Sequence, residues 1–380
     1  MWLKQKYCII YILFSGIDSH IIRRKIQQTC CEWESTDLGK ETISGRNGKI
    51  ELLRFLAAIF IMNGHLTQIG FENDRPFLGG WFYVEFFFML TGYFTMMHFE
   101  KKRAEAGIDV VKYSVTYTIK KFIKFLPYTT GAILLTYLAS NHDLWVSGHK
   151  TEYFRAFENM PFEMLYLSAA NTDSSRMFTI WFISAMFIVF PLFCLLLQIK
   201  NKHLVFLICF NYSVFYYLLR YDFGSQAYPN QLIRAFAGLC LGVVVYFAAE
   251  RFRHLQFGTC KRAGITVLGV VTYWLPVLIC FKNILFLRGN LLCFIVSLII
   301  IFSGQSKIPD FSNKVLTWLG KLSMPLYVWH MAIKTVIQVY FYQLPMNKQV
   351  CIFWVGSFAA AFINMVLVDL ANAKRREKVK

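Results

Sequence analysis

Long apolar segments separated by short polar ones dominate this chain from residue 50 to its C-terminal region. About 20 consecutive apolar residues is the length that an α-helix needs to cross a bilayer. The pattern predicts ten transmembrane helices, over residues 50–69, 79–99, 122–140, 178–199, 203–219, 231–249, 263–281, 289–303, 322–342 and 349–371. Membrane β-barrels alternate polar and apolar positions instead. The predicted fold class is therefore an all-α polytopic membrane protein.

The composition agrees with this fold class. Hydrophobic residues make up 56% of the chain and charged residues 16%, whereas soluble domains carry about 25% charged residues. A net charge of +18 would suggest nucleic-acid binding in a soluble protein, but membrane proteins concentrate Lys and Arg in cytoplasmic loops. With the N-terminus inside, most Lys and Arg fall on the inner side. We therefore expect both termini in the cytoplasm and no nucleic-acid partner.

The pattern divides the chain into three parts. Residues 1–49 are expected to form a disordered cytoplasmic extension, or to result from a start codon placed too early. Residues 50–371 form the predicted transmembrane domain, and residues 372–380 a basic cytoplasmic tail. The ten cysteines include no Cys-x-x-Cys pair, so we expect no metal site.

The ionisable residues within the first predicted span include Arg54 and His65, and a charge inside a bilayer is costly, so each needs a partner or a function. Arg54 and His65 are eleven residues apart, which puts them on one helix face, about 16 Å apart along the axis. Arginine suits a phosphate-bearing cofactor that arrives from the cytoplasm. Histidine can accept and return a proton near neutral pH. Alternatively, Arg54 reaches lipid headgroups and His65 makes an interhelical hydrogen bond.

The second predicted span carries Glu85 at a depth similar to that of His65. A short loop joins the two spans, so they are expected to be antiparallel neighbours. A carboxylate beside the imidazole would orient the ring and raise its basicity. The sequence thus predicts a pair of His65 and Glu85. The alternative is that Glu85 is structural and pairs with Arg234 or a tyrosine.

A basic cluster lies at the cytoplasmic end of the third predicted span. Lys121 and Lys124 are three residues apart and should face one side of a helix. They could hold the phosphates of a cytoplasmic cofactor or bind lipid headgroups. Trp81, Trp145 and Trp181 offer ring faces for a sugar, although anchoring at the membrane interface is the commoner use.

Together these segments resemble the acyltransferase 3 family of integral-membrane acyltransferases, which includes O-acetyltransferases of bacterial surface glycans. Arg54 and His65 resemble its Arg-x10-His signature, and residues 84–93 its acidic-Phe-Phe-x-x-Ser-Gly-Phe segment. Further similar segments, in family order, are residues 121–127, the Trp-centred residues 179–184, Arg234 with Gly238, and residues 319–330 with their Gly-x-x-Ser and Tyr-x-x-His patterns.

The resemblance implies transfer of an acyl group, most simply acetyl, from cytoplasmic acetyl-CoA or another acyl-CoA. The implied acceptor is a hydroxyl of an exported or cell-surface glycan, such as exopolysaccharide, capsule or lipopolysaccharide, at a bacterial inner membrane. In the resulting hypothesis His65 and Glu85 are catalytic, and Arg54, Lys121 and Lys124 hold the acyl-CoA phosphates. The expected substrate-binding residues are Arg234, Tyr327, His330 and Trp181. Besides the glycan or lipid-linked sugar, only membrane lipids are expected as partners.

Some positions depart from the family pattern. Positions 121 and 124 carry lysine where the family has arginine, and lysine cannot make a bidentate contact with phosphate. Thr91 occupies a position where the family usually has serine. The short segment after residue 371 predicts that the extracytoplasmic hydrolase-like domain of some relatives is absent. The alternative function is a non-enzymatic glycolipid transporter or flippase, in which buried ionisable residues relay protons. A membrane glycosyltransferase is a third class, but no convincing site for its donor is evident.

Overall fold

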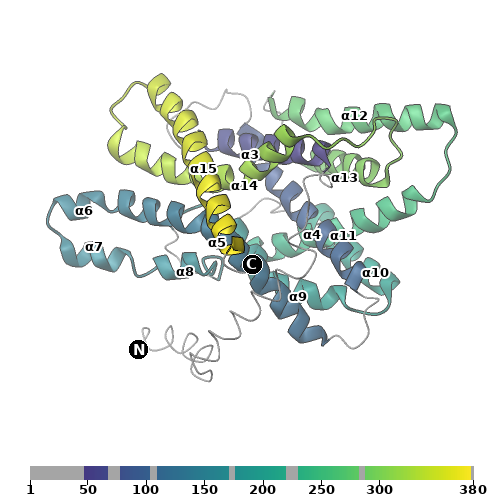
Figure 1. Ribbon diagram of the computed structural model, residues 1–380, viewed down its shortest axis with the longest axis horizontal. Coiled ribbons are helices and arrows are strands. Elements are labelled where there is room, and N and C mark those ends of the chain that lie inside the picture. Colours follow the sequence, from purple (N-terminus) through teal and green to yellow (C-terminus); the bar gives the residue numbers. More distant parts are fainter. Residues whose placement is uncertain are drawn as a thin grey trace. The chain divides into compact units, whose positions relative to one another are not determined.

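The computed structural model describes residues 47–66, 78–102, 109–170, 176–219, 230–281 and 287–377. Regular structure in these ranges is entirely helical, without a strand (Figure 1), which confirms the all-α class. Residues 47–370 form one compact unit. Residues 1–46 of the predicted extension lie outside the described residues.

A helix overlaps each of the ten predicted spans, although the bounds differ, most of all for α5, which begins twelve residues before the predicted 122–140. In chain order they are α3 (Gly48–Gly64), the 3₁₀-helix η4 (Leu78–Phe82), α4 (Tyr83–Lys102), α5 (Val110–Ser140), the short α6 (His142–Val146), α7 (Lys150–Ala156) and α8 (Met160–Met164), α9 (Ile180–Leu197), α10 (Lys202–Val214), the π-helix η5 (Phe215–Leu219), α11 (Asn230–Arg253), α12 (Thr259–Phe281), α13 (Leu287–Ser303), α14 (Lys314–Tyr340) and α15 (Met346–Glu377). The fifth predicted span corresponds to α10 continued by η5.

Within the described ranges, six helical segments are long and apolar enough to cross a membrane. They are α5, α9, α10 with η5, α11, α12 and α15; the shorter apolar segment 288–303 lies in α13. Helices α3, α4 and α14, which carry ionisable side chains such as Arg54, Glu85 and His330, are not among the six. This content fits an integral membrane protein, whereas ten crossings and cytoplasmic termini stay predictions.

Glycines bring helices α4 and α11 into close contact. A Cβ atom on Gly92 would lie 2.0 Å from the carbonyl oxygen of Leu239, and one on Gly242 would lie 2.2 Å from that of Met89. Small residues let helix backbones approach in this way. Glu85 precedes Gly92 by seven residues, about two turns, so it lies on the same α4 face. The glycine contact therefore directs Glu85 towards α11.

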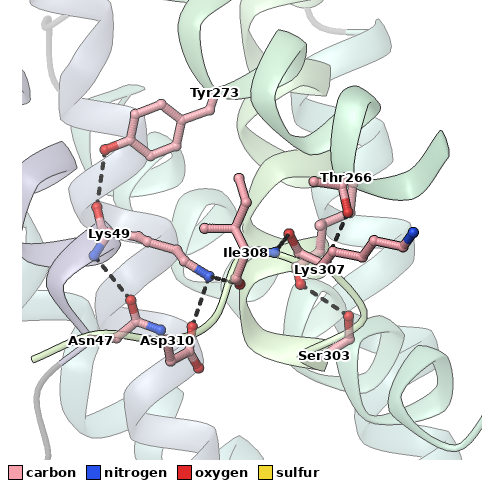
Figure 2. Close-up of polar contacts among 10 residues, drawn as sticks. Asn47, Lys49, Thr266, Tyr273, Ser303, Lys307, Ile308 and Asp310 are labelled. Atoms are coloured by element: carbon pink, nitrogen blue, oxygen red, sulfur yellow. Dashed lines mark hydrogen bonds and ion pairs between the residues drawn. The ribbon is translucent and has the colours of Figure 1, made fainter. Parts of the chain in front are cut away.

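The start of α3 is fixed by polar contacts to the connection between α13 and α14 (Figure 2). The Lys49 ammonium lies 2.9 Å from an Asp310 carboxylate oxygen and 2.9 Å from the Ile308 carbonyl oxygen. The Tyr273 hydroxyl donates to the Lys49 carbonyl oxygen at 3.0 Å, and the Asn47 side chain caps the helix at the Lys49 N–H. These contacts set where α3 begins, and hence where its later polar residues lie.

Candidate functional site

A pair of buried histidines joins the end of α3 to α14. His65 Nδ1 lies 2.8 Å from the Ile61 carbonyl oxygen and 3.2 Å from His330 Nε2. His330 Nδ1 lies 3.1 Å from the Leu326 carbonyl oxygen. A carbonyl oxygen only accepts hydrogen bonds, so in the neutral rings both Nδ1 atoms carry the hydrogen. The hydrogen-bond network therefore assigns the lone pair of His65 to Nε2.

Glu85 belongs to a different cluster. Arg234 Nε lies 2.5 Å from Glu85 Oε1, and the Tyr217 hydroxyl donates to Oε2. The side chains of Glu85 and Arg234 are both 0% exposed. The predicted contact of Glu85 with His65 is therefore wrong, and the alternative, pairing with Arg234 and a tyrosine, is what the structure contains. The glycine contact of α4 with α11 is the physical reason. A catalytic role of Glu85 stays a prediction.

The Arg234 guanidinium also lies close to two indole rings. Its central carbon is 5.1 Å from the ring centre of Trp181 and 5.7 Å from that of Trp81, distances at which a cation is attracted to an aromatic face. The structure thus brings together Arg234 and Trp181, two of the four predicted substrate-binding residues. The Trp181 ring contacts two protein groups, the Arg234 guanidinium and the Phe88 ring, whose centroid is 6.5 Å away in an edge-to-face arrangement.

Tyr327 connects this cluster to the histidine pair. Its ring centroid is 6.1 Å from that of His330 and 5.5 Å from that of Phe182, and Phe182 in turn lies 6.3 Å from Trp181. The Tyr327 hydroxyl donates to the Thr179 carbonyl oxygen at 3.0 Å. Residues from α3, α9, α11 and α14 therefore form one continuous set around Tyr327, although the sequence separates them widely.

Arg54 lies nearer the start of α3 and is paired within its own helix. Its Nη1 atom is 3.1 and 3.3 Å from the two carboxylate oxygens of Glu51. Glu51 packs on α14, where Gly320 leaves room for its carboxylate. Each end of the Arg-x10-His signature is therefore linked to α14. Arg54 is linked through Glu51, which packs at Gly320, and His65 contacts His330 directly. The contacts occur in the same order along both helices, so α3 and α14 run in the same direction.

The two predicted phosphate-binding lysines have different surroundings. Lys121 turns towards α4 and α9: its ammonium is 3.3 Å from Thr95 Oγ1 and 4.6 Å from the ring centre of Phe190. Lys124 is exposed. A joint role of the two lysines in phosphate binding stays a prediction.

Sequence reasoning missed Tyr217 and Glu51. Tyr217 lies in the π-helix η5, and no sequence pattern indicates that its hydroxyl reaches Glu85. Glu51 stands three residues before Arg54, a spacing at which opposite charges on a helix meet, so this contact could have been predicted. Among the described residues, no group of three or more His, Cys, Asp or Glu side chains is arranged to hold a metal ion.

Comparison with known proteins gives a consistent result. A family model described as an acyltransferase domain matches residues 47–370. Proteins from Staphylococcus aureus strains COL, MSSA476 and MRSA252, each named "Putative O-acetyltransferase", are 26% identical to this chain over 332 residues. The match covers 76% of this chain and 51% of each relative, so the chain spans about half the length of these curated relatives. No solved structure matches the chain.

Proposed function

Because this chain belongs to the acyltransferase domain family, whose model covers residues 47–370, we propose that it is a membrane O-acyltransferase. It moves an acyl group, most simply acetyl, from cytoplasmic acyl-CoA to a hydroxyl of an exported or cell-surface glycan. The names of the Staphylococcus aureus relatives support O-acetyl transfer. The apolar helices support an integral membrane location, which we propose to be a bacterial inner membrane.

The arrangement of His65 is the observation that carries this proposal. Its Nδ1–H points at the Ile61 carbonyl oxygen and His330 Nε2, which leaves Nε2 as the basic nitrogen. His65 then acts as general base and removes the proton of the acceptor hydroxyl. The hydroxyl oxygen attacks the thioester carbonyl carbon, a C–O bond forms and the C–S bond breaks. His65 returns the proton to the departing thiolate of coenzyme A.

His330 acts in this scheme on His65 and not on the substrate. By accepting from Nδ1–H it holds the ring in one tautomer, and it stabilises the imidazolium that forms when Nε2 takes a proton. This is the role that the sequence assigned to Glu85. His330 itself is held by the Leu326 carbonyl oxygen and is 0% exposed, so its ring cannot easily turn.

Arg54 is the proposed contact for the acyl-donor phosphates. It lies about 16 Å from His65 along the axis of α3, a separation that the long pantetheine arm of coenzyme A can span. A guanidinium pairs well with phosphate oxygens. Lys121 and Lys124 would add positive charge on the same side, and Trp181, Arg234 and Tyr327 would line the way to the acceptor.

The test is the mass of the host's surface glycan in a strain that lacks this gene and carries either the original gene, His65→Ala or a control variant. Gly264→Ala is the control, because a Cβ atom there meets no other atom within 4 Å. The original gene and the control should restore one acetyl mass per modified repeat, and His65→Ala should not. Restoration by His65→Ala, with the protein at equal level in the membrane, would overturn the assignment of the base.

Binding of coenzyme A separates this proposal from the glycolipid flippase alternative. The purified full-length protein should be stabilised against heat by coenzyme A, because a ligand that binds the folded state raises the unfolding temperature. A flippase has no reason to bind this molecule. An unfolding temperature unchanged by saturating coenzyme A would favour the flippase.

A further inference from the structure

Glu51 connects Arg54 to helix α14 from a buried position. The Glu51 side chain is 7% exposed and that of Arg54 is 28% exposed, so Glu51 is the more deeply buried member of the pair. Both Glu51 oxygens lie within 3.3 Å of Arg54 Nη1. A charge-assisted contact of this kind is stronger than a neutral hydrogen bond, so it holds Nη1 beside the carboxylate.

Gly320 is what allows the carboxylate to sit there. A Cβ atom at position 320 would lie 1.6 Å from Glu51 Oε2 and 2.6 Å from Glu51 Cδ, so no other residue fits without moving Glu51. Gly320 is itself buried, and the Ser323 hydroxyl donates to the Gly320 carbonyl oxygen at 2.7 Å. The space beside Gly320 on α14, the Gly320 seat, therefore holds the Glu51 carboxylate in a defined position.

We infer that Glu51 and Gly320 are positioning residues: the Gly320 seat holds Glu51, and Glu51 orients the Arg54 guanidinium towards a phosphate group of the acyl donor. A guanidinium has five N–H donors in one plane, so it can bind a carboxylate at one edge and a phosphate at another. Arg54 is the more exposed of the two side chains, and the more buried Glu51 carboxylate contacts it. This arrangement fits such a use. The inference deepens the proposed function and rests on it.

Gly320→Ala tests the seat without changing any charge. In the purified full-length protein, the KM for acetyl-CoA should rise about tenfold, the effect of a weakened charge-assisted contact, while kcat changes less than about threefold. S-acetylpantetheine provides the discriminating comparison, because it carries the thioester but no phosphate. Its KM should stay the same in Gly320→Ala as in the original protein, whereas general damage to the site would raise both.

Gly356→Ala is a matched control on α15. Its Cβ atom would lie 3.2 Å from Ile333 Cγ2, a side-chain atom of α14 that can give way, so neither KM should change. Glu51→Ala should raise the KM for acetyl-CoA by a similar factor to Gly320→Ala. The double variant should be no worse than either single variant, because both changes remove the same contact. Effects that multiply would show that the two residues act separately.

Glu51→Gln covers the case in which Gly320→Ala does not fold. It keeps the size of the side chain and should also raise the KM for acetyl-CoA about tenfold. An unchanged KM in a folded variant, or a lower one, would overturn the inference, since a lower KM would mean that Glu51 merely competes with the phosphate for Arg54. If the original protein neither binds nor uses acetyl-CoA, the proposed function itself fails, and that result is distinct from these.

Discussion

Two helix contacts of this bundle contain ionisable side chains, and the surroundings of these side chains differ between the two. Between α4 and α11, Glu85 and Arg234 are both 0% exposed and face each other across backbones brought together by glycines. Between α3 and α14, Arg54 is 28% exposed, and the His65–His330 pair leaves one His65 nitrogen outside its hydrogen bonds.

The difference separates polar groups that hold the fold from groups that can meet a ligand. Within the α4–α11 contact, both Glu85 oxygens have partners from the protein, Arg234 on one and Tyr217 on the other. A buried charge that loses such a partner is strongly destabilising, whereas a partly exposed pair contributes little to stability. Of two ionisable clusters in one bundle, the one whose cation is partly exposed is therefore the better candidate for chemistry.

The largest effect is expected from breaking the buried ion pair. Arg234→Met leaves Glu85 charged inside the bundle, so it should lower the free energy of unfolding by about 3–5 kcal/mol. The measurement is the fraction of purified protein that remains monodisperse in detergent, which should fall. Adding Glu85→Leu removes the stranded charge and should recover much of the folded protein. A single Arg234→Met variant as stable as the original would remove the contrast between the two contacts.

A smaller effect is expected from separating the α4 and α11 backbones. Gly242→Ala places a methyl group 2.2 Å from the Met89 carbonyl oxygen, and such overpacking typically costs about 1–3 kcal/mol. The thermal unfolding temperature in detergent measures it. Gly264→Ala in α12, with open space around it, should be neutral or slightly stabilising because alanine favours helix more than glycine does. Equal unfolding temperatures for both variants would contradict the close contact.

The smallest effect on stability is expected at the α3–α14 contact. Arg54→Met breaks an ion pair whose cation is 28% exposed and whose Glu51 partner is nearly buried, so it should lower the free energy of unfolding by about 1 kcal/mol. That is less than the effect of losing Arg234 from a pair that is 0% exposed. Stabilisation by coenzyme A should be lost in the same variant, because the proposed phosphate contact is gone. An Arg54→Met protein as unstable as Arg234→Met would show that Arg54 serves the fold instead.

The sequence determined the elements of this protein and the identity of several candidate residues. Apolar segments of bilayer length predict helices that the structure contains, because length and hydropathy are local properties of a chain. Arg54, Glu85, His65 and Arg234 could also be selected without a structure, since an ionisable residue in an apolar segment needs a partner or a function.

Only the tertiary structure decided which residues meet. Depth in the membrane made Glu85 a reasonable partner for His65, but depth does not fix the direction in which a side chain points. The glycines of α4 and α11 turn Glu85 towards Arg234 and Tyr217, while α14 brings His330 to His65 over a separation of 265 residues. Helix rotation depends on the packing of two surfaces that are distant in the chain, and no local pattern contains that information.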